Sequence, residues 1–248
     1  MTRLKQTWYR EWFNSEYYDL LYEHRDQVEA KLFIANLFNH LKLDQDIKVL
    51  DLACGKGRHS IQVHDLGYEV IGLDLSEESI KYAQQFQGQG IHFQSGDMRN
   101  IPFTNKFDLV LNLFTSFGYF EEESENIEVI RSIANALKTD GMLVLDFMNI
   151  HKVIREIPNE ETVQRNKVHF EIRKYLDDGA IVKDIRYKVD GKEQNQLELV
   201  KLIDLPLFQS YFDEAGLELK DVFGDYHFNA FDPEQSDRLI MIAQKPKL

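Results

Sequence analysis

The segment that most constrains this chain runs from Val49 to Ser60 and reads VLDLACGKGRHS. An apolar run typical of a buried strand includes an acid, Asp51, and leads into two glycines one residue apart, Gly55 and Gly57. In open α/β sheets a strand that passes through such a loop into a helix binds nucleotide-like ligands, because glycine lets the ligand approach the backbone and the helix N-terminus carries partial positive charge. The segment therefore predicts a parallel α/β fold with a ligand site at the strand ends.

Two kinds of ligand fit this loop. A dinucleotide site uses a third glycine, which lets the helix pack closely on the sheet, and this chain has Ser60 at that position. S-adenosylmethionine has no pyrophosphate, and its ammonium group suits Asp51, whose carboxylate would repel a pyrophosphate. The loop motif alone leaves both ligands open, together with a plain strand-to-helix turn.

Acidic and small residues also follow the next three predicted strands. A second predicted strand begins at Tyr68 and ends in Asp74, about 20 residues after the glycine loop, where an acid can bind a ribose diol. The predicted strands at 91–94 and 107–114 lead into the segments SGDMR and TSFGYF. Four consecutive strands that deliver such residues to one edge of a sheet favour a ligand site over chance turns.

These ordered motifs, DLACGKG, GLD, GDMR and FDLV, resemble those of class I S-adenosylmethionine-dependent methyltransferases. The resemblance covers about residues 46 to 149, and the ACGKGRH, GDMR and FTSFGY segments are most similar to those of small-molecule N-methyltransferases, including enzymes that dimethylate amino sugars. It implies a doubly wound, Rossmann-like α/β fold with a seven-stranded, mostly parallel sheet. It also implies S-adenosylmethionine as the cofactor.

The resemblance implies a set of cofactor contacts. Gly55 and Gly57 face the methionine end, Asp74 holds the ribose hydroxyls, and Asp97 and Met98 meet the adenine. The predicted site is completed by neighbours of these motifs and one residue near the N-terminus, namely Tyr18, Asp51, Ala53 and Leu75.

Composition limits the partners. The net charge is −13, so the surface repels phosphate backbones, and we predict a small-molecule acceptor and no nucleic-acid partner. The fourth strand is followed by no Asn/Asp-Pro-Pro-aromatic motif, which enzymes acting on flipped bases use. A single cysteine, Cys54, excludes an internal disulfide, and no apolar run is long enough to span a membrane or form a signal peptide. We therefore expect a cytoplasmic protein with no membrane partner.

The N-terminal residues 1–45 form a predicted helical lid rich in aromatic side chains. A helix is expected from near Ser15 to Leu41, with a break, and its predicted apolar face consists of Leu21, Val28, Leu32, Ala35 and Phe38. The aromatic residues either pack in the core or close over the cofactor. In related methyltransferases a tyrosine of such a lid lies near the methionine carboxylate, and Tyr18 is the candidate here.

Residues 151–205 interrupt the core pattern. Apolar and polar residues alternate from about Val163 to Leu205, and Asp-Gly pairs at 178–179 and 190–191 predict hairpin turns, so we expect an inserted antiparallel β meander. The insertion is either a stabilising flap or homodimer surface, or a wall of the substrate pocket. The cofactor-binding core is predicted to comprise residues 46–150 and 206–248, with a helix at 208–216 and a final hairpin of strands at 217–222 and 239–244.

Direct in-line displacement is the predicted mechanism, because a sulfonium already activates the methyl group and the protein needs mainly to position the acceptor. Tyr119 is the candidate catalytic residue, at a position where the similar amino-sugar enzymes often have histidine. An unperturbed phenol has a pKa near 10, which disfavours it as a base. Tyr119 therefore either removes a proton, orients the acceptor or forms a wall of the pocket. No spacing of Asp, His or Cys residues predicts a metal site, although Asp146 and Asn149 follow the last parallel strand. The alternatives are an NAD-dependent oxidoreductase and a non-catalytic S-adenosylmethionine-binding protein.

Overall fold

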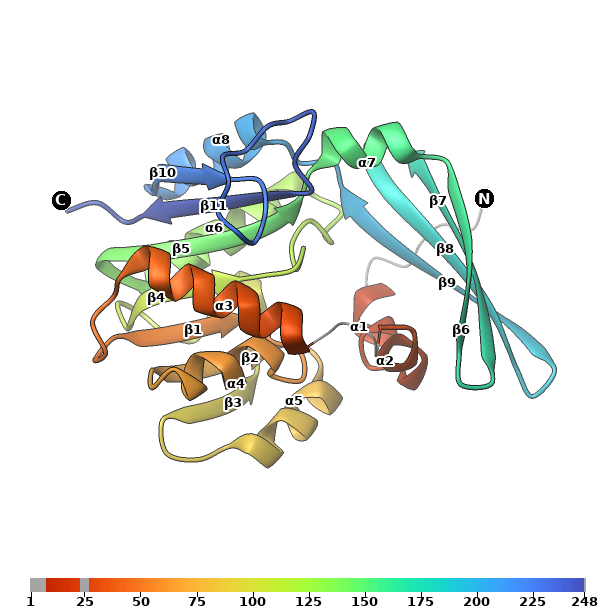
Figure 1. Cartoon of the computed structure of the whole chain (residues 1–248), viewed down its shortest axis with the longest axis horizontal. Helices are drawn as coiled ribbons and strands as arrows, with labels where there is room; N and C mark the ends of the chain where they lie inside the picture. The colour runs from red at the N-terminus through yellow and green to blue at the C-terminus, as the bar shows by residue number, and fades with distance from the viewer. Residues whose placement is uncertain (1–7, 23–26, 248) are drawn as a thin grey trace.

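A computed structural model describes residues 8–22 and 27–247, which form two β-sheets and the helices around them (Figure 1). The larger sheet has seven strands in the order β10-β11-β5-β4-β1-β2-β3, of which the five from β5 to β3 are parallel. Its strands are β1 Lys48–Leu52, β2 Glu69–Asp74, β3 Ile91–Ser95, β4 Phe107–Asn112, β5 Leu137–Met148, β10 Glu218–Phe223 and β11 Arg238–Gln244. The predicted doubly wound α/β fold is confirmed.

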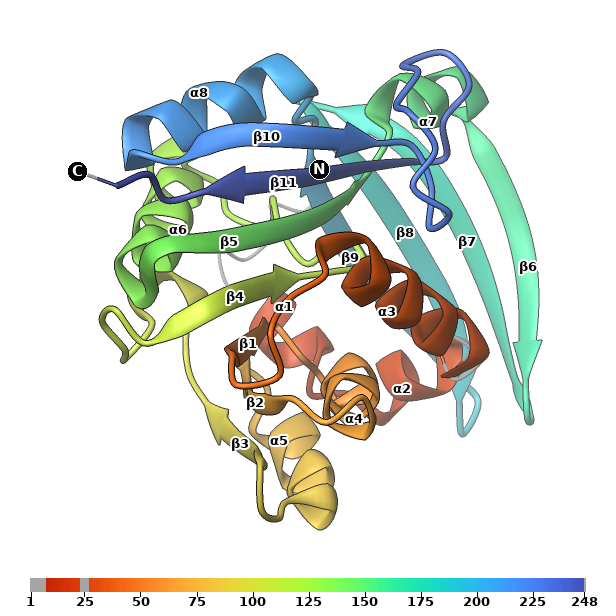
Figure 2. The same cartoon turned by 60° about the vertical axis from the view of Figure 1, so that its left-hand side comes forward.

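Helices cover both faces of this sheet, so the core has three layers (Figures 1 and 2). One face packs against α3 Gln27–Leu41, α4 Arg58–Asp65 and α5 Glu77–Ala83, and the other against α6 Glu123–Ala136 and α8 Leu205–Ala215. Short elements complete the chain: α1 Trp8–Trp12, α2 Glu16–Tyr22, α7 Ile150–Glu156, and the 3-10 turns η1 Gln84–Phe86 and η2 Met98–Asn100. No helix in the described ranges is both long and apolar enough to cross a bilayer.

The point at which strand order reverses lies between β1 and β4. The chain winds outward from β1 to β3 on one side and from β4 to β5 on the other, so the loops that follow β1 and β4 diverge there. Open α/β sheets bind ligands in the crevice at this switch point. The final hairpin is antiparallel, as predicted, because β11 pairs in opposite direction with both β5 and β10.

A separate four-stranded antiparallel sheet stands beside the core (Figure 1). Its strands are β6 Asn159–Arg165, β7 Val168–Asp177, β8 Ala180–Val189 and β9 Lys192–Lys201. At the β7–β8 turn, Asp178 and Gly179 have φ of 43° and 70°, and at the β8–β9 turn Asp190 and Gly191 have 49° and 78°. These left-handed conformations are those of a type I′ hairpin turn, so the Asp-Gly prediction is confirmed.

The predicted limits of the meander were wrong at both ends. The sheet begins at Asn159, and it ends at Lys201 because α8 already begins at Leu205. Asp204 caps this helix by accepting a hydrogen bond from the Leu207 backbone N–H at 3.0 Å, and Pro206 suits the first turn. The helix predicted to begin at Phe208 therefore starts three residues earlier.

The predicted apolar face of the N-terminal helix was wrong for Val28, Leu32 and Ala35, whereas Leu21 and Phe38 are buried as predicted. Val28 and Leu32 are 69% and 43% exposed, whereas the buried face of α3 consists of Ala30, Phe33, Ile34, Leu37 and Phe38. Phe33 stacks on Tyr226 with ring centroids 4.3 Å apart, a partner nearly two hundred positions away that sequence spacing could not reveal. The predicted helix is described as α2, which ends at Tyr22, and α3, which begins at Gln27; residues 23–26, like 1–7 of the predicted lid, lie outside the described residues.

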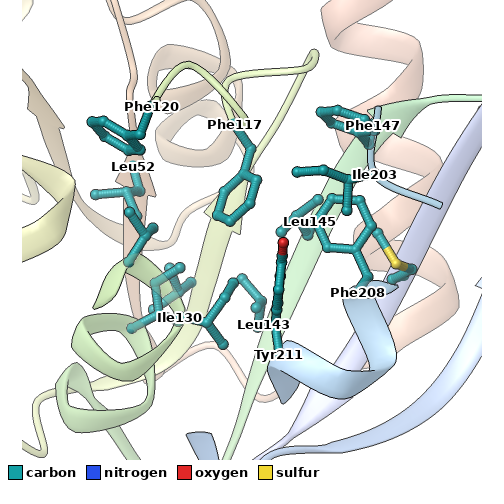
Figure 3. Packing of buried hydrophobic residues seen from close by; sticks show 14 of the residues in the cluster. Leu52, Phe117, Phe120, Ile130, Leu143, Leu145, Phe147, Ile203, Phe208 and Tyr211 are labelled. Atoms are coloured by element: carbon teal, nitrogen blue, oxygen red, sulfur yellow. The ribbon is translucent and has the colours of Figure 1, made fainter. Parts of the chain in front are cut away.

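One hydrophobic cluster joins the core to the second sheet and to the N-terminal helices. Within it Phe117, from the loop after β4, is fully buried with its ring 5.5 Å from that of Phe208 on α8 (Figure 3). Phe120 of the same loop is 4% exposed and packs on Tyr9 of α1. These two anchors hold the loop that carries Tyr119.

Candidate active site

Two cavities lie at the switch point of the large sheet. The smaller cavity is about 90 Å³ and runs along the ends of β1, β2 and β3. The larger cavity is about 950 Å³ and extends from the β1 loop to the second sheet. Seven residues line both cavities, namely Phe13, Tyr18, Ala53, Gly55, Ser79, Ser116 and Tyr119. The two cavities therefore meet beside the glycine loop and Tyr119, and we call this place the junction.

The glycine loop is shaped by left-handed backbone. Ala53, Gly55 and Gly57 have φ of 60°, 54° and 84°. A Cβ at Gly55 would meet nothing within 4 Å, because the residue borders the cavities, whereas a Cβ at Gly57 would lie 2.7 Å from the Phe93 ring. Gly55 thus keeps ligand space open, and Gly57 permits close packing where α4 begins.

Asp51 lies behind this loop. It is 1% exposed, and its Oδ2 accepts a hydrogen bond from the Ser60 hydroxyl at 2.5 Å. Burial raises the pKa of Asp51 to about 6, although the hydrogen bonds from Ser60 act in the opposite direction. Asp51 is not among the residues that line either cavity, so its predicted contact with an ammonium group stays a prediction.

Asp74 lines the smaller cavity at the end of β2. Its Oδ2 accepts the Gly55 backbone N–H at 2.7 Å and its Oδ1 accepts the Ser76 backbone N–H at 2.8 Å. Burial raises the pKa of Asp74, and the backbone hydrogen bonds work against that rise. Each carboxylate oxygen has a second lone-pair site, so Asp74 can hold the glycine loop and still accept hydroxyl groups.

Leu75, Asp97 and Met98 complete the wall of the smaller cavity. Arg99 donates to both carboxylate oxygens of Asp97, through Nε at 3.0 Å and Nη2 at 2.5 Å. Although burial opposes the effect, these hydrogen bonds hold the pKa of Asp97 below its usual value. Asp97 is therefore a fixed carboxylate, and the apolar Leu75 and Met98 beside it offer contact for a flat ring.

The loop after β4 carries Tyr119 to the junction. Phe114 and Thr115 have φ of 60° and 62°, which is uncommon for residues other than glycine and clusters at functional sites. The Tyr119 hydroxyl donates a hydrogen bond to the Thr115 carbonyl at 2.7 Å. A phenol that donates a hydrogen bond to a carbonyl can still accept another through its oxygen. Tyr119 is therefore better suited to orient an N–H donor than to remove a proton.

The N-terminal helices pack over the junction. The rings of Trp8 and Phe13 contact Tyr119 edge-on, with centroids 5.8 and 5.2 Å away. The Tyr18 ring lies 5.0 Å from Phe13, and the Ser76 hydroxyl donates to Asn14 Oδ1 at 2.7 Å. The aromatic residues are thus both packed and placed over the cavities.

A second set of contacts ties α1 and α2 to the second sheet through Glu198 of β9. Its carboxylate accepts hydrogen bonds from Trp12 Nε1 at 2.6 Å and from the Tyr22 hydroxyl at 2.7 and 2.8 Å. Lys183 of β8 donates to that hydroxyl and lies 3.9 Å from Glu198. Tyr22, Lys183 and Glu198 all line the larger cavity.

Arg238 also lines the larger cavity, and it forms an ion pair with the buried Asp146. Arg238, the first residue of β11, donates through Nε to Asp146 Oδ1 at 2.8 Å and through Nη2 to Thr115 Oγ1 at 3.0 Å. Asp146 is fully buried and also accepts the Phe114 backbone N–H at 2.8 Å. Asn149 caps α7, and the described residues contain no cluster of three or more His, Cys, Asp or Glu suited to a metal.

Comparison with known proteins identifies the family. Residues 43–199, which make up well over half of the chain, match the family model described as a methyltransferase domain. The chain belongs to this methyltransferase family. The methyltransferase is 29% identical to the putative methyltransferase YqeM of Bacillus subtilis (strain 168) over 211 residues, which span 81% of this chain and 85% of YqeM.

Solved structures agree with this assignment. An S-adenosylmethionine-dependent methyltransferase from Clostridium acetobutylicum has a TM-score of 0.78 at 20% identity and covers 93% of this chain and 96% of its own. CalS10, an amino pentose methyltransferase from Micromonospora echinaspora with S-adenosylmethionine bound, has a TM-score of 0.68 at 19% identity, with 93% and 97% covered. The resemblance noted in the sequence is confirmed: the chain is an S-adenosylmethionine-dependent methyltransferase of class I, and its cofactor is S-adenosylmethionine.

Most of the site residues predicted from the sequence lie together in the structure, but other residues that line the cavities were not predicted. Tyr18, Ala53, Gly55 and Tyr119 meet at the junction, and Asp74, Leu75, Asp97 and Met98 line the smaller cavity. Glu198 and Lys183 were missed because their partners lie more than 160 positions away. Asp146 carried a usable signal, since an acid inside the apolar run MLVLDFM indicates a buried charge that needs a partner, but nothing in the sequence pointed to Arg238, 92 positions away, as that partner.

Proposed function

We propose that this methyltransferase transfers a methyl group to the nitrogen of a small-molecule amine at the junction of the two cavities. The observation that supports this most is the arrangement of the cavities, which share the seven residues of the junction, Gly55 and Tyr119 among them, and otherwise have different walls. A cofactor held along the smaller cavity would present one end at the junction. The larger cavity then has room for an acceptor on the other side.

S-adenosylmethionine supplies an activated methyl group, which the nitrogen lone pair takes as the carbon–sulfur bond breaks, leaving S-adenosylhomocysteine. In the proposal Gly55 and Gly57 shape the methionine end, Asp74 accepts the ribose hydroxyls, and Asp97 and Met98 border the adenine. Ala53, Leu75 and Tyr18 complete this wall, and Asp51, which lies behind the glycine loop, is proposed to meet the ammonium group. Tyr119 accepts a hydrogen bond from the acceptor N–H and so directs its lone pair toward the methyl group.

The domain division follows from the same proposal. Residues 1–45 act as a lid, residues 46–150 and 206–248 bind the cofactor, and residues 151–205 supply an acceptor wall. Lys174, Lys183 and Glu198 of the inserted sheet line the larger cavity, which supports a wall rather than a flap alone. The net charge of −13 supports a small-molecule acceptor over a nucleic acid, and we keep the expectation of a cytoplasmic location.

Incubation with S-adenosylmethionine and a panel of amino sugars, amino acids and simple amines tests the proposal, with S-adenosylhomocysteine and the methylated product measured by mass spectrometry. We expect one amine class to give stoichiometric product. Binding of S-adenosylhomocysteine without turnover of any amine, alcohol or thiol would instead indicate a non-catalytic binding protein. Light scattering of the purified protein tests the homodimer expected at the inserted sheet.

A further inference from the structure

Arg238 is placed to bind a ligand as well as to hold the fold. Its side chain is 18% exposed and lines the larger cavity. A guanidinium has five N–H donors, and the structure uses one at Nε, toward Asp146, and one at Nη2, toward Thr115. Among residues 8–22 and 27–247, no hydrogen-bond partner is found for Nη1. The remaining donors are therefore available to a molecule in the cavity.

The guanidinium is also held rigidly. Its central carbon lies 5.6 Å from the centre of the Phe114 ring and 5.9 Å from that of the Tyr226 ring. The Asp146 carboxylate that pairs with it also accepts hydrogen bonds from the Phe114 backbone and the Tyr226 hydroxyl, so its negative charge is shared among several donors. A rigid arginine loses little conformational entropy when it binds an oxyanion.

The lining of the larger cavity is less acidic than the whole chain. The chain carries −13, yet five cationic side chains and three acidic ones line this cavity. The cationic residues are Lys56, Arg58, Lys174, Lys183 and Arg238, and the acidic ones are Glu16, Asp19 and Glu198. Two of these cations pair with acids outside the lining, Arg238 with Asp146 and Lys174 with Glu161, so the charges at the cavity balance and an anionic ligand group is repelled less there than by the chain as a whole.

Thr115 links Arg238 to the junction. Its hydroxyl oxygen accepts a hydrogen bond from Arg238, and its carbonyl accepts one from Tyr119. The covalent geometry of Thr115 therefore keeps the Arg238 guanidinium and the Tyr119 hydroxyl within about 10 Å of each other. A molecule that touches both groups needs only a few bonds between them.

We propose that Arg238 binds an oxyanion of the methyl acceptor, so that the acceptor is a compact amine bearing a carboxylate or phosphate a few bonds from its nitrogen. This inference rests on the proposed function, because it places the nitrogen beside Tyr119. Carboxylates and phosphates share the chemistry that a guanidinium fork recognises.

Matched acceptors test the inference. Each amino acid is assayed beside its amide, and each aminoalkyl phosphate beside its amino alcohol. The wild-type enzyme should prefer the anionic member by about 10- to 100-fold in kcat/KM, as expected for hydrogen bonds to a charged group, and the better of the two anionic series identifies the oxyanion. Equal rates for both members of every pair would overturn the inference.

Variants locate the effect at Arg238. The double variant Arg238→Met with Asp146→Asn removes both charges of the pair and leaves no buried charge unpaired. It should lose the preference, because the anionic acceptors slow by more than the neutral ones. Arg238→Lys keeps a cation beside Asp146 but lacks the fork, and it should lose most of the preference if the double variant does not fold. Arg131→Met, at an exposed arginine paired with Glu214, is the matched control and should behave as wild type. A preference for anionic acceptors that persists in both Arg238 variants would refute the inference.

A binding readout separates this inference from the proposed function. With S-adenosylhomocysteine present and ionic strength held constant with chloride, acetate or inorganic phosphate should raise the melting temperature of the wild type. The Arg238 variants should keep stabilisation by S-adenosylhomocysteine and lose that by the anion. If no amine is methylated but this pattern holds, the proposed function fails and the anion site stands; equal anion effects in all variants would remove the site.

Discussion

The two cavities are built in different ways. The smaller cavity takes most of its wall from the ends of the consecutive strands β1, β2 and β3 and the segments that follow them. Its polar groups are fixed by backbone N–H groups a few residues away or by the neighbouring loop. The larger cavity joins the N-terminal helices, the second sheet and β11, through contacts such as Trp12 with Glu198, 186 positions apart. The cofactor side is therefore encoded locally, whereas the acceptor side exists only once the whole chain has folded.

This contrast predicts that a single change in the glycine loop is enough to disrupt cofactor binding. Gly55→Val should lower the affinity for S-adenosylhomocysteine by more than about 100-fold, because its side chain would enter space that borders both cavities. Isothermal titration calorimetry measures this. Gly179→Val, at another left-handed glycine with open surroundings, carries the same backbone strain in a hairpin turn and should bind normally. Unchanged affinity in folded Gly55→Val would place the cofactor elsewhere.

At the junction, removal of one hydroxyl should affect turnover and not binding. We expect Tyr119→Phe to reduce kcat by about 100-fold while the cofactor affinity stays the same, because the ring remains packed against Trp8 and Phe13. Steady-state kinetics with the best amine tests this. Tyr211→Phe removes a hydroxyl from the hydrophobic core and should leave kcat unchanged. Near-normal turnover of Tyr119→Phe would reduce Tyr119 to a pocket wall.

Asp74→Ala should have a smaller effect on the cofactor than Gly55→Val. We expect a loss of about 1–3 kcal/mol in binding free energy, because ribose hydroxyls lose a charged acceptor and the Gly55 N–H loses its partner. The control is Asp108→Ala. Asp108 also accepts a backbone N–H, from Lys48 at 2.9 Å, but at the opposite end of the strands. Equal affinities for the two variants would remove Asp74 from the site.

The smallest expected effect concerns pH. Burial, and to a lesser extent Arg58, lowers the pKa of His59 to about 3, whereas the unfolded chain titrates near 6.5. As pH falls below about 6.5, His59 takes up a proton in the unfolded state but not in the folded state. The contribution of His59 to the free energy of unfolding is therefore full above that pH and is lost progressively toward pH 3. Between pH 7 and 5 the loss should reach about 2 kcal/mol.

Urea unfolding of wild type and His59→Gln at both pH values isolates this loss. Asp51, whose pKa is raised to about 6, increases the free energy of unfolding as pH falls from about 6 to 4. This contribution is the same in both proteins, so it cancels when their stabilities are compared. Parallel pH profiles for the two proteins would show that His59 titrates normally.

Sequence patterns predicted correctly those elements whose conformation depends on a few neighbouring residues. The apolar runs predicted β1, β2, β3 and β4 to within a few residues, and the Asp-Gly pairs predicted both hairpin turns of the second sheet. They failed for α3, which carries apolar residues on two faces. Only the partners Tyr226 and Tyr68, which contact Phe33 and Phe38, decide which face is buried.

The sequence by itself determined the α/β class, the glycine loop and the acids that follow β2 and β3, because each depends on backbone geometry within a few residues. Tertiary structure alone decided that Glu198 would join the lid to the second sheet and that Arg238 would meet Asp146 and Thr115. The physical reason is chain separation: a side chain's partner more than 90 positions away leaves no periodicity or spacing in the sequence, and it is fixed only when the strands and helices pack.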